Sequence, residues 1–361
     1  MYHILKRMKD DGKLVSIYTD EERDSTFMVG YVTALTPEEL LIKAISPNGQ
    51  YDGYMWVRTE DVFRCAVNGR YEEKILKLCS FHLKEETDFT VKGKSEILKE
   101  LLLFSMQKKK LLEVTTGSQV LTGYVMKYSD NVLVIREFDT YGQEKETVYL
   151  SMEMVDAIYM DTISCREIER LAGSDVEVSD VCNSDVSDMY HVLECIKEKE
   201  QLISVFNDPE EDDSFAVGYI TELNQEELLL KYYSPQGLYD GYRWMRVEDI
   251  FQCGTDGCYE KRVPYFCEAQ NDGNIGFAPE NDQDILKELF RFSMEKEKLL
   301  VFELPSEYIT GYIRSYSEEL LEIQSIDDSG QEDEHIYLDK EMVSEIQMDT
   351  LTCKKMEIWR R

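Results

Sequence analysis

The side chains with the greatest capacity for binding are concentrated in a block that occurs twice, at Ser46–Cys65 and Ser234–Cys253. In both places the block reads S-P-x-G-x-Y-D-G-Y-x-W-x-R-x-E-D-[VI]-F-x-C. Tyrosine, tryptophan and arginine dominate the hot spots of protein interfaces. The block therefore predicts an interaction surface formed by these side chains: Tyr51, Tyr54, Trp56, Arg58, Tyr239, Tyr242, Trp244 and Arg246.

The same block is also consistent with a purely structural hairpin. Asn48-Gly49 supplies the positive φ angles of a tight turn, and the aromatic residues would then pack across the strands. In this second interpretation Arg58 pairs with Glu60 or Asp61. Both interpretations are compatible with the sequence.

Residues typical of catalytic and metal sites do not form a recognisable pattern. His3 and His191 recur at matching positions, each at the start of an expected helix, and His3 has no nearby Cys or His in the sequence. Cys253 and Cys258 are close, yet Arg70 stands at the position that corresponds to Cys258, which argues against zinc. No phosphate-binding glycine loop or nucleophile motif is present. We therefore predict a protein without catalytic activity, cofactor or metal.

The composition restricts the class of partner. The chain of 361 residues is 43% hydrophobic, which is globular, and it carries a formal net charge of −33. Such a charge repels phosphate backbones and favours a protein partner or self-association through edge strands. Nucleic acid is therefore a disfavoured partner, although the charge alone does not exclude it. No apolar run approaches the length that spans a bilayer, and the N-terminal residues do not resemble a secretion signal. The nine cysteines are an odd number and lack short paired spacings, which favours reduced thiols. We therefore expect a cytoplasmic protein without membrane association.

The chain is an internal duplication. Phe27–Cys65 aligns with Phe215–Cys253 without a gap, and Ile97–Leu112 aligns with Ile285–Leu300 at the same offset of 188 residues. Residues 1–173 and 189–361 are thus two copies of one unit. The acidic stretch 172–188 contains no Lys or Arg and is expected to be a linker.

A weaker repeat divides each half. Gly30-Tyr31-Val32 corresponds in pattern to Gly123-Tyr124-Val125, and the apolar rhythm around both agrees. We therefore expect four modules in the order A-B-A-B: A1 at 1–80, B1 at 96–171, A2 at 189–267 and B2 at 284–361.

Each module shows the same succession of elements. An amphipathic helix comes first, clearest at 97–110, and five short strands follow. In A1 the strands are expected at 14–18, 28–35, 40–46, 54–58 and 62–67, with a mid-strand glycine in the second strand marking a bend or a close backbone approach. A mainly β fold with short helices is predicted.

This order resembles the Sm-like family, which includes the Lsm proteins and bacterial Hfq. The resemblance implies four small five-stranded barrels of Sm-like or SH3-like type, each preceded by a helix, and edge-strand pairing between barrels. Family members bind RNA through an Asp and an Asn in the first motif and an apolar-Arg-Gly turn in the second. Here Asp130 occupies the first Asp position in B1 only, and Thr59 follows Val57-Arg58 where the family has Gly. The base-contacting Asn is replaced in every module, by Leu40, Leu133, Leu228 and Leu321.

Three functions remain open after these observations, the last of which is an enzyme for which no residue can be named. We expect a non-catalytic protein-interaction or scaffold protein built of tandem Sm-like barrels. The alternative is a protein related to nucleic acid, which either binds RNA through the Sm-like fold or mimics nucleic acid with its acidic surface.

Overall fold

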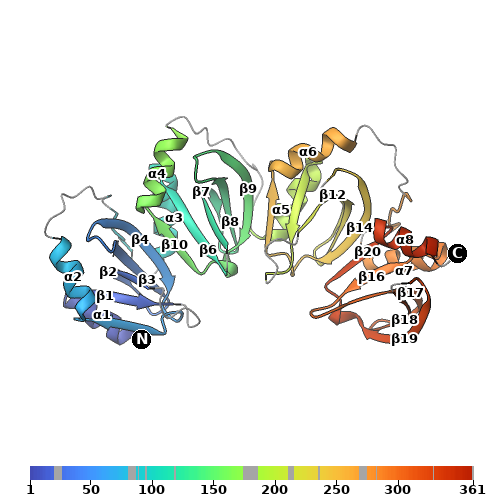
Figure 1. The fold of residues 1–361 in the computed structure, drawn as a ribbon, viewed down its shortest axis with the longest axis horizontal. Coiled ribbons are helices and arrows are strands. Elements are labelled where there is room, and N and C mark those ends of the chain that lie inside the picture. The colour runs from blue at the N-terminus through green and yellow to red at the C-terminus, as the bar shows by residue number, and fades with distance from the viewer. Residues whose placement is uncertain are drawn as a thin grey trace. The chain divides into compact units, whose positions relative to one another are not determined.

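The computed structural model describes residues 1–19, 27–79, 87, 89–93, 96–117, 119–173, 186–209, 215–234, 236–267, 275–281, 283–327 and 329–359. Residues 174–185, most of the expected acidic linker, lie outside this set. The described chain is mainly β, with short helices, as the sequence predicts (Figure 1). Its strands belong to an antiparallel sheet that does not close on itself. The chain separates into two compact units.

Unit 1 comprises Met1–Tyr128, Leu133–Lys145 and Met152–Val181. Its A1 elements are α1 (Tyr2–Asp10), β1 (Leu14–Tyr18), β2 (Met28–Leu35), β3 (Glu39–Ile45), β4 (Tyr51–Arg58), β5 (Arg64–Val67) and α2 (Arg70–Cys79). The B1 elements are α3 (Ile97–Lys108), β6 (Leu111–Thr116), β7 (Gln119–Tyr128), β8 (Val132–Phe138), β9 (Glu144–Ser151), the 3-10 helix η1 (Met152–Met154), β10 (Ala157–Met160) and α4 (Ile163–Ala172).

Unit 2 comprises Ser129–Val132, Glu146–Ser151 and Cys182–Arg361, so it includes the greater part of β9. Its A2 elements are α5 (Met189–Glu198), β11 (Leu202–Phe206), β12 (Ala216–Leu223), β13 (Glu227–Tyr233), β14 (Tyr239–Arg246), β15 (Gln252–Thr255) and α6 (Cys258–Cys267). The B2 elements are α7 (Ile285–Lys296), β16 (Leu300–Glu303), β17 (Tyr308–Tyr316), β18 (Leu320–Ile326), β19 (Glu332–Asp339), the 3-10 helix η2 (Lys340–Met342), β20 (Glu345–Met348) and α8 (Leu351–Trp359).

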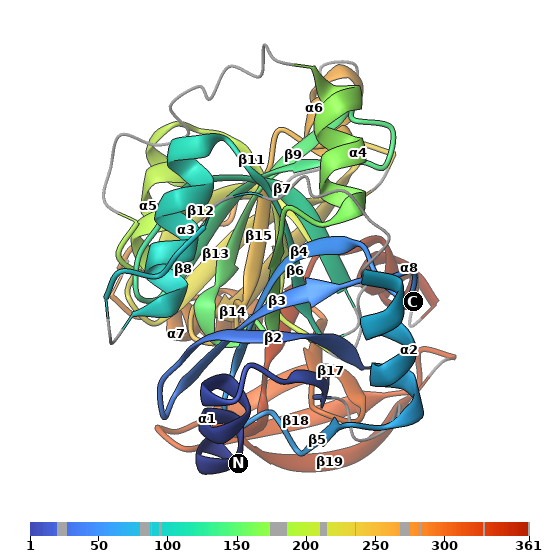
Figure 2. The same cartoon turned by 90° about the vertical axis from the view of Figure 1, so that its left-hand side faces the viewer.

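The five strands of A1 pair in the order β5–β1–β2–β3–β4. The same order recurs in A2 as β15–β11–β12–β13–β14 and in B2 as β20–β16–β17–β18–β19. Helices cover this sheet, and α1 packs on β2 while α2 packs on β1 (Figure 2).

The mid-strand glycines lie where two strands come closest. A Cβ on Gly30 would be 2.2 Å from the carbonyl oxygen of Lys43 in the neighbouring strand, and one on Gly123 would be 2.2 Å from that of Arg136. Register shifts between Val32 and Ala34 and between Lys43 and Ile45 add bulges on either side. Bulges increase the bend of a sheet, so the expected close approach at these glycines is present.

The modules do not close on themselves separately, as four independent barrels would. In unit 1 the fourth strand of A1, β4, pairs with the last strand of B1, β10, and in unit 2 β14 pairs with β20 in the same way. One antiparallel sheet therefore runs through both modules of each unit. The reason is that the backbone N–H and C=O groups on the outer edge of β4 and β14 form hydrogen bonds with the last strand of the next module. Among the described strands, they do not pair with the fifth strand of the same module.

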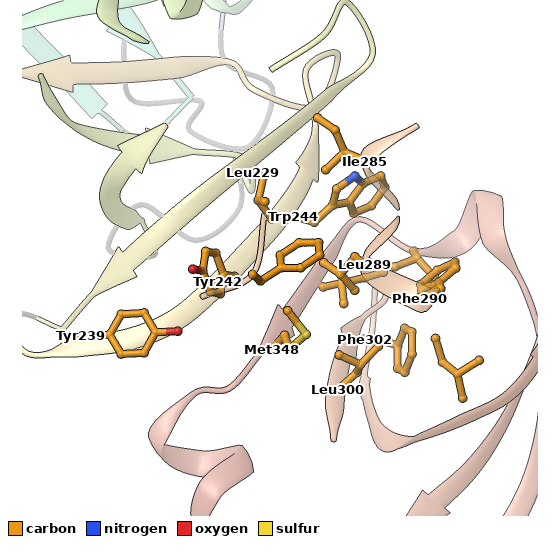
Figure 3. Packing of buried hydrophobic residues seen from close by; sticks show 14 of the residues in the cluster. Leu229, Tyr239, Tyr242, Trp244, Ile285, Leu289, Phe290, Leu300, Phe302 and Met348 are labelled. Atoms are coloured by element: carbon orange, nitrogen blue, oxygen red, sulfur yellow. The ribbon is translucent and has the colours of Figure 1, made fainter. Parts of the chain in front are cut away.

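The core of unit 2 shows how the two modules are joined (Figure 3). Buried side chains from β13 and β14 of A2 form one continuous cluster with those of α7, β16 and β20 of B2: Leu229, Tyr239, Tyr242, Trp244, Ile285, Leu289, Phe290, Leu300, Phe302 and Met348. Since apolar burial is the main stabilising term in folding, A2 and B2 share a core and stabilise each other.

Candidate interaction site

The repeated block lies on β4 in unit 1 and on β14 in unit 2, the strands that join the modules. Trp56 is opposite Ile158 and Tyr54 is opposite Met160 in the β4–β10 register. Trp244 is opposite Ile346 and Tyr242 is opposite Met348 in unit 2. The block is therefore placed against module B of the same unit in both copies.

The Asp-Gly pair of the block fits the end of the B module. The Asp52 carboxylate accepts a hydrogen bond of 2.8 Å from the backbone N–H of Ile163, at the start of α4. Gly53 has a φ of +79°, and a Cβ there would be 2.1 Å from the carbonyl oxygen of Met160. Only glycine combines this backbone conformation with so close an approach. In unit 2, Asp240 accepts a hydrogen bond from Leu351 at the start of α8, and Gly241 has a φ of +90°.

A tryptophan and a glutamate connect the block to the first helix of the B module. The indole N–H of Trp56 donates to Glu39 Oε1 over 3.0 Å. The same carboxylate accepts from the backbone N–H groups of Ile97, at 2.8 Å, and Leu98, at 2.9 Å. Because the first N–H groups of a helix have no partner within it, Glu39 caps α3 from another module.

Unit 2 repeats this arrangement with the same residue types. Trp244 Nε1 donates to Glu227 over 3.2 Å, and Glu227 accepts from the N–H groups of Ile285, at 2.7 Å, and Leu286, at 3.1 Å. Neither glutamate was singled out by the sequence analysis. The signal that could have found them is their recurrence at the 188-residue offset, at the first residue of the strand before the block's hairpin.

The arginine of the block binds the 3-10 helix of the B module. Arg58 donates to the carbonyl oxygens of Met152, at 3.3 Å, and Glu153, at 3.2 Å. It also lies 3.9 Å from Asp61, the partner that the hairpin interpretation named. Arg246 makes the equivalent bonds to the carbonyl oxygens of η2, at Lys340 and Glu341. A guanidinium with several donors suits such a pair of convergent carbonyls.

A buried aspartate completes the junction in each unit. Asp161, with a positive φ of 59°, is 2% exposed and is 2.8 Å from Lys110 Nζ. Burial alone disfavours the ionised carboxyl, but hydrogen bonds from Lys110 and Thr87 outweigh it and lower the pKa of Asp161. Burial, followed by the nearby Asp161 charge, raises the pKa of the Tyr51 hydroxyl. The Tyr51 hydroxyl therefore stays neutral and does not act as an acid.

The equivalent cluster in unit 2 is centred on Asp349, which is 1% exposed. Its carboxylate lies 3.0 Å from Lys298 Nζ and 3.0 Å from Lys354 Nζ, and it accepts a hydrogen bond of 3.2 Å from the Tyr239 hydroxyl. Asp161 and Asp349 were also missed by the sequence analysis, although they too recur at the 188-residue offset.

We call these contacts the inter-module clamp: in unit 1 it comprises Glu39, Asp52, Gly53, Trp56 and Arg58, and in unit 2 Glu227, Asp240, Gly241, Trp244 and Arg246. The six aromatic residues proposed as an interaction surface are buried: Tyr51, Tyr54, Trp56, Tyr239, Tyr242 and Trp244. Arg58 and Arg246 are partly exposed. The structure thus brings all eight predicted residues to the A–B junction of their own unit, with the aromatic side chains turned away from solvent.

A pocket opens beside the clamp in both units. In unit 1 it has a volume of about 320 Å³ and is lined by Pro37, Glu38, Glu39, Trp56, Arg58, Glu60, Leu98 and Met152. In unit 2 it has a volume of about 420 Å³ and is lined by Gln225, Glu226, Glu227, Trp244, Arg246, Glu248, Leu286, Lys340 and Glu341. Exposed glutamates at the rim suit the basic side chains of a partner.

The remaining candidates from the sequence are accounted for as follows. Within the described ranges, no group of three or more His, Cys, Asp or Glu side chains could hold a metal ion. Cys165, Cys253 and Cys353 are free and buried, and burial raises the pKa of the Cys165 thiol to about 12. Cys195 is disulfide-bonded, which corrects the expectation that all thiols are reduced; spacing along the sequence does not show which thiols come close in space. No helix of the described chain is long and apolar enough to cross a membrane.

Comparison with known proteins does not assign a family. No family model matches the chain, and no curated protein matches it. Among solved structures, the chain is similar to the four MBT repeats of Drosophila melanogaster Sfmbt, solved in complex with a peptide that contains a methylated lysine. The identity is 12%, the match covers 98% of this chain and 91% of that chain, and the TM-score is 0.12.

Proposed function

We propose that this chain is a non-catalytic protein-interaction scaffold in which four Sm-like, five-stranded modules are joined edge to edge in the order A-B-A-B. The observation that carries the proposal is the use of the repeated block. Asp52 and Arg58 bind module B directly, and Trp56 is linked to it through Glu39 of its own module, which caps the first helix of B. In unit 2, Asp240, Arg246 and the Trp244–Glu227 pair repeat these contacts. The most distinctive chemistry of the chain therefore serves assembly of modules.

The strand order supports the Sm-like part of the proposal. The fifth strand pairs with the first, and the fourth strand of one module pairs with the fifth strand of another, as in the β4–β10 and β14–β20 junctions. Edge pairing of this kind uses backbone hydrogen bonds for affinity and leaves side chains to set specificity.

The pockets beside the clamp are the part of this surface that we propose for a partner. Glu38 and Glu60 are exposed at the rim in unit 1, and Glu226 and Glu248 hold the same places in unit 2. Together with the net charge of −33, this favours a basic protein segment as the occupant and disfavours RNA.

The test is a capture experiment with charge reversal at the rims. The double variant Glu60→Lys, Glu248→Lys changes the pockets, and Glu73→Lys, Glu319→Lys makes the same change in charge at exposed positions elsewhere. Partners cross-linked from the native cell should bind the wild type and the control variant and be lost from the pocket variant. Capture of nothing above a tag-only control would refute the scaffold function, and unchanged capture by the pocket variant would refute the pockets as its site.

A further inference from the structure

The two pockets beside the clamp share most of their lining. Six of the eight residues that line the unit 1 pocket recur as the same residue type 188 positions later in the unit 2 pocket: Glu38, Glu39, Trp56, Arg58, Glu60 and Leu98. Glu38 and Glu60 are exposed, as are their counterparts Glu226 and Glu248. Exposed side chains contribute little to stability, so they diverge readily between the copies of a duplicated domain. The retention of both glutamates therefore favours a role in binding.

The apolar part of the lining differs between the two pockets. In unit 1 it comprises four residues: Pro37, Trp56, Leu98 and Met152. In unit 2 the first and last of these are replaced by Gln225 and Lys340. Lysine and arginine lay their aliphatic stems along apolar surface and keep the charged group in water. The unit 1 pocket therefore offers more surface to the stem of a basic side chain.

Unit 2 already places a cation of its own in this pocket. The Lys340 ammonium lies 5.6 Å from the centre of the Phe290 ring and 5.4 Å from that of the Tyr316 ring. Burial is the largest influence on Lys340 and lowers its pKa, so its ammonium is only partly hydrated. A second cation beside it would be repelled, and water would screen that repulsion only in part. In unit 1, Met152 replaces the lysine and Leu102 replaces the phenylalanine, so this position carries no charge.

The unit 1 pocket keeps its carboxylates without that internal cation. Its described lining has three glutamates against the single guanidinium of Arg58. That guanidinium donates hydrogen bonds to two carbonyl oxygens of η1, and the Glu39 carboxylate accepts three hydrogen bonds within the clamp. Glu38 and Glu60 are the exposed carboxylates, so an incoming ammonium or guanidinium meets their negative charge first.

We propose that the unit 1 pocket takes one lysine or arginine side chain from a basic segment of a partner protein. The stem of that side chain packs against Met152 and Leu98, and its charged group lies at the carboxylates of Glu38 and Glu60. The unit 2 pocket binds the same side chain more weakly, because Lys340 lies there. This inference rests on the proposed function and adds which pocket is the stronger site and which side chain it takes.

Tryptophan supplies a reporter for each pocket. The chain has three tryptophans: Trp56 lines the unit 1 pocket, Trp244 lines the unit 2 pocket, and Trp359 lies in α8, outside both described linings. With isotope-labelled tryptophan, each indole N–H gives one nuclear magnetic resonance signal in the full-length chain, and Trp244→Phe and Trp359→Phe assign the signals. Binding at one pocket should shift one signal, whereas a general attraction of cations to the acidic chain should not favour Trp56.

The probes are peptides Gly-Gly-X-Gly-Gly with blocked ends, in which X is lysine, arginine, norleucine or glutamate. Norleucine has an aliphatic stem like that of lysine without the charge. The lysine and arginine peptides should shift the Trp56 signal in a saturable way. Their Kd at Trp56 should be about fivefold lower than that of the norleucine peptide, and about fivefold lower than their own Kd at Trp244, since each exposed ion pair contributes only modestly.

Exchanging one residue between the pockets tests the cause of the difference. Lys340→Met should lower the Kd of the lysine peptide at Trp244, and Met152→Lys should raise its Kd at Trp56 by about fivefold. The matched control is Met154→Lys, which makes the same change in charge within η1 at a residue outside the described pocket lining. Because Lys340→Met predicts a gain of binding, a loss of folding cannot imitate the result.

Equal affinity for the lysine and norleucine peptides, tighter binding of the glutamate peptide, or no saturable shift of Trp56 would overturn the basic side chain as the occupant. Equal affinities at Trp56 and Trp244, an unchanged response of Trp244 in Lys340→Met, or equal effects of Met152→Lys and Met154→Lys would overturn the assignment of the stronger site to unit 1. Capture of partners from the cell is measured independently, so failure here and failure of the scaffold function are distinguishable.

Discussion

Replacing Glu39 with glutamine should weaken the inter-module clamp of unit 1 with almost no change in shape. The carboxylate accepts three hydrogen bonds, from Trp56 and Leu98 on Oε1 and from Ile97 on Oε2. An amide has only one oxygen, so its NH2 group must face at least one of these donors. Glu39→Gln therefore leaves an N–H group at the start of α3 without an acceptor.

The size of the effect follows from these three bonds. An unsatisfied buried N–H costs about 1–3 kcal/mol, and each hydrogen bond that loses its charged acceptor loses about 1 kcal/mol. The negative charge at the helix N-terminus contributes about 0.5 kcal/mol more. Glu39 is partly exposed, so water recovers part of the loss, and we expect a net destabilisation of about 2–3 kcal/mol.

The matched control is Glu38→Gln, the adjacent and exposed glutamate at the rim of the same pocket. Surface substitutions of this kind change stability by less than about 0.5 kcal/mol. Urea unfolding of the full chain gives the free energies, and Glu227→Gln with the control Glu226→Gln repeats the comparison in unit 2.

Hydrogen exchange distinguishes loss of the cap from general destabilisation. In Glu39→Gln, the amides of Ile97 and Leu98 should exchange faster than those in the middle of α3, because their acceptor is the group that changes. Equal unfolding midpoints for Glu39→Gln and Glu38→Gln, together with unchanged exchange at both amides, would refute the capping role.

Three further changes test two positions at the junctions, Gly53 and Asp161, and one buried carboxyl within module A2, Glu260. Gly53→Ala and Gly12→Ala both place alanine at a positive φ, but only at Gly53 would the added Cβ meet neighbouring backbone within 4 Å. Gly53→Ala should therefore lower the free energy of unfolding by at least about 2 kcal/mol more than Gly12→Ala does in thermal unfolding. Equal losses would contradict the close approach. The pKa of Asp161 is lowered in the folded state, so the stability that it adds is present above its unfolded pKa and is lost as the pH falls through the folded pKa. Asp161→Asn should remove this loss of stability at acid pH. An unchanged decrease in unfolding free energy below neutral pH would argue against the Lys110 contact. Glu260 of α6 is buried and accepts a hydrogen bond from the Ser204 hydroxyl, and burial raises its pKa. Its contribution to stability is therefore full below the unfolded pKa and is lost as the pH rises through the folded pKa. Glu260→Gln should flatten the unfolding profile above about pH 4.5, and parallel profiles would contradict this.

The local elements could be predicted from the sequence because each depends on a short pattern. β1 and β2 begin and end at the residues expected from their apolar runs, and α3 starts at Ile97 as its amphipathic stripe indicated. β4 begins at Tyr51, three residues earlier than expected, because its pairing with β3 extends to the hairpin. The helices that follow the fifth strands, such as α2 at Arg70–Cys79, were not predicted. Their apolar positions at Tyr71, Ile75 and Leu78 have helical spacing, and that signal was overlooked.

The candidate site was found from the sequence, but not its orientation. Composition distinguishes poorly between a surface hot spot and a buried junction, because both use Tyr, Trp and Arg. The two interpretations are distinguished by the residues that the block contacts, and these lie far away in the sequence. Glu39 is 58 positions from the first residue of the helix that it caps, and Asp52 is 111 positions from Ile163. Pairings over such distances leave no pattern within one window of sequence. The duplication was the only available guide, since both sides of each contact recur together.

The clamp also explains why only A modules carry the block. A fourth strand that bears it, β4 or β14, meets the B module within its own unit. That B module holds the donor for the Asp52 carboxylate and the acceptors for the Arg58 guanidinium, and the glutamate that binds the Trp56 indole caps the first helix of B. The B-type fourth strand β9 meets β15 without Asp-Gly, Trp or Arg at the matching places, using Thr147, Val148, Tyr149 and Leu150 instead. The A–B pair is the smallest piece of this chain that contains both halves of a clamp, and it is also the unit that the strong 188-residue repeat contains.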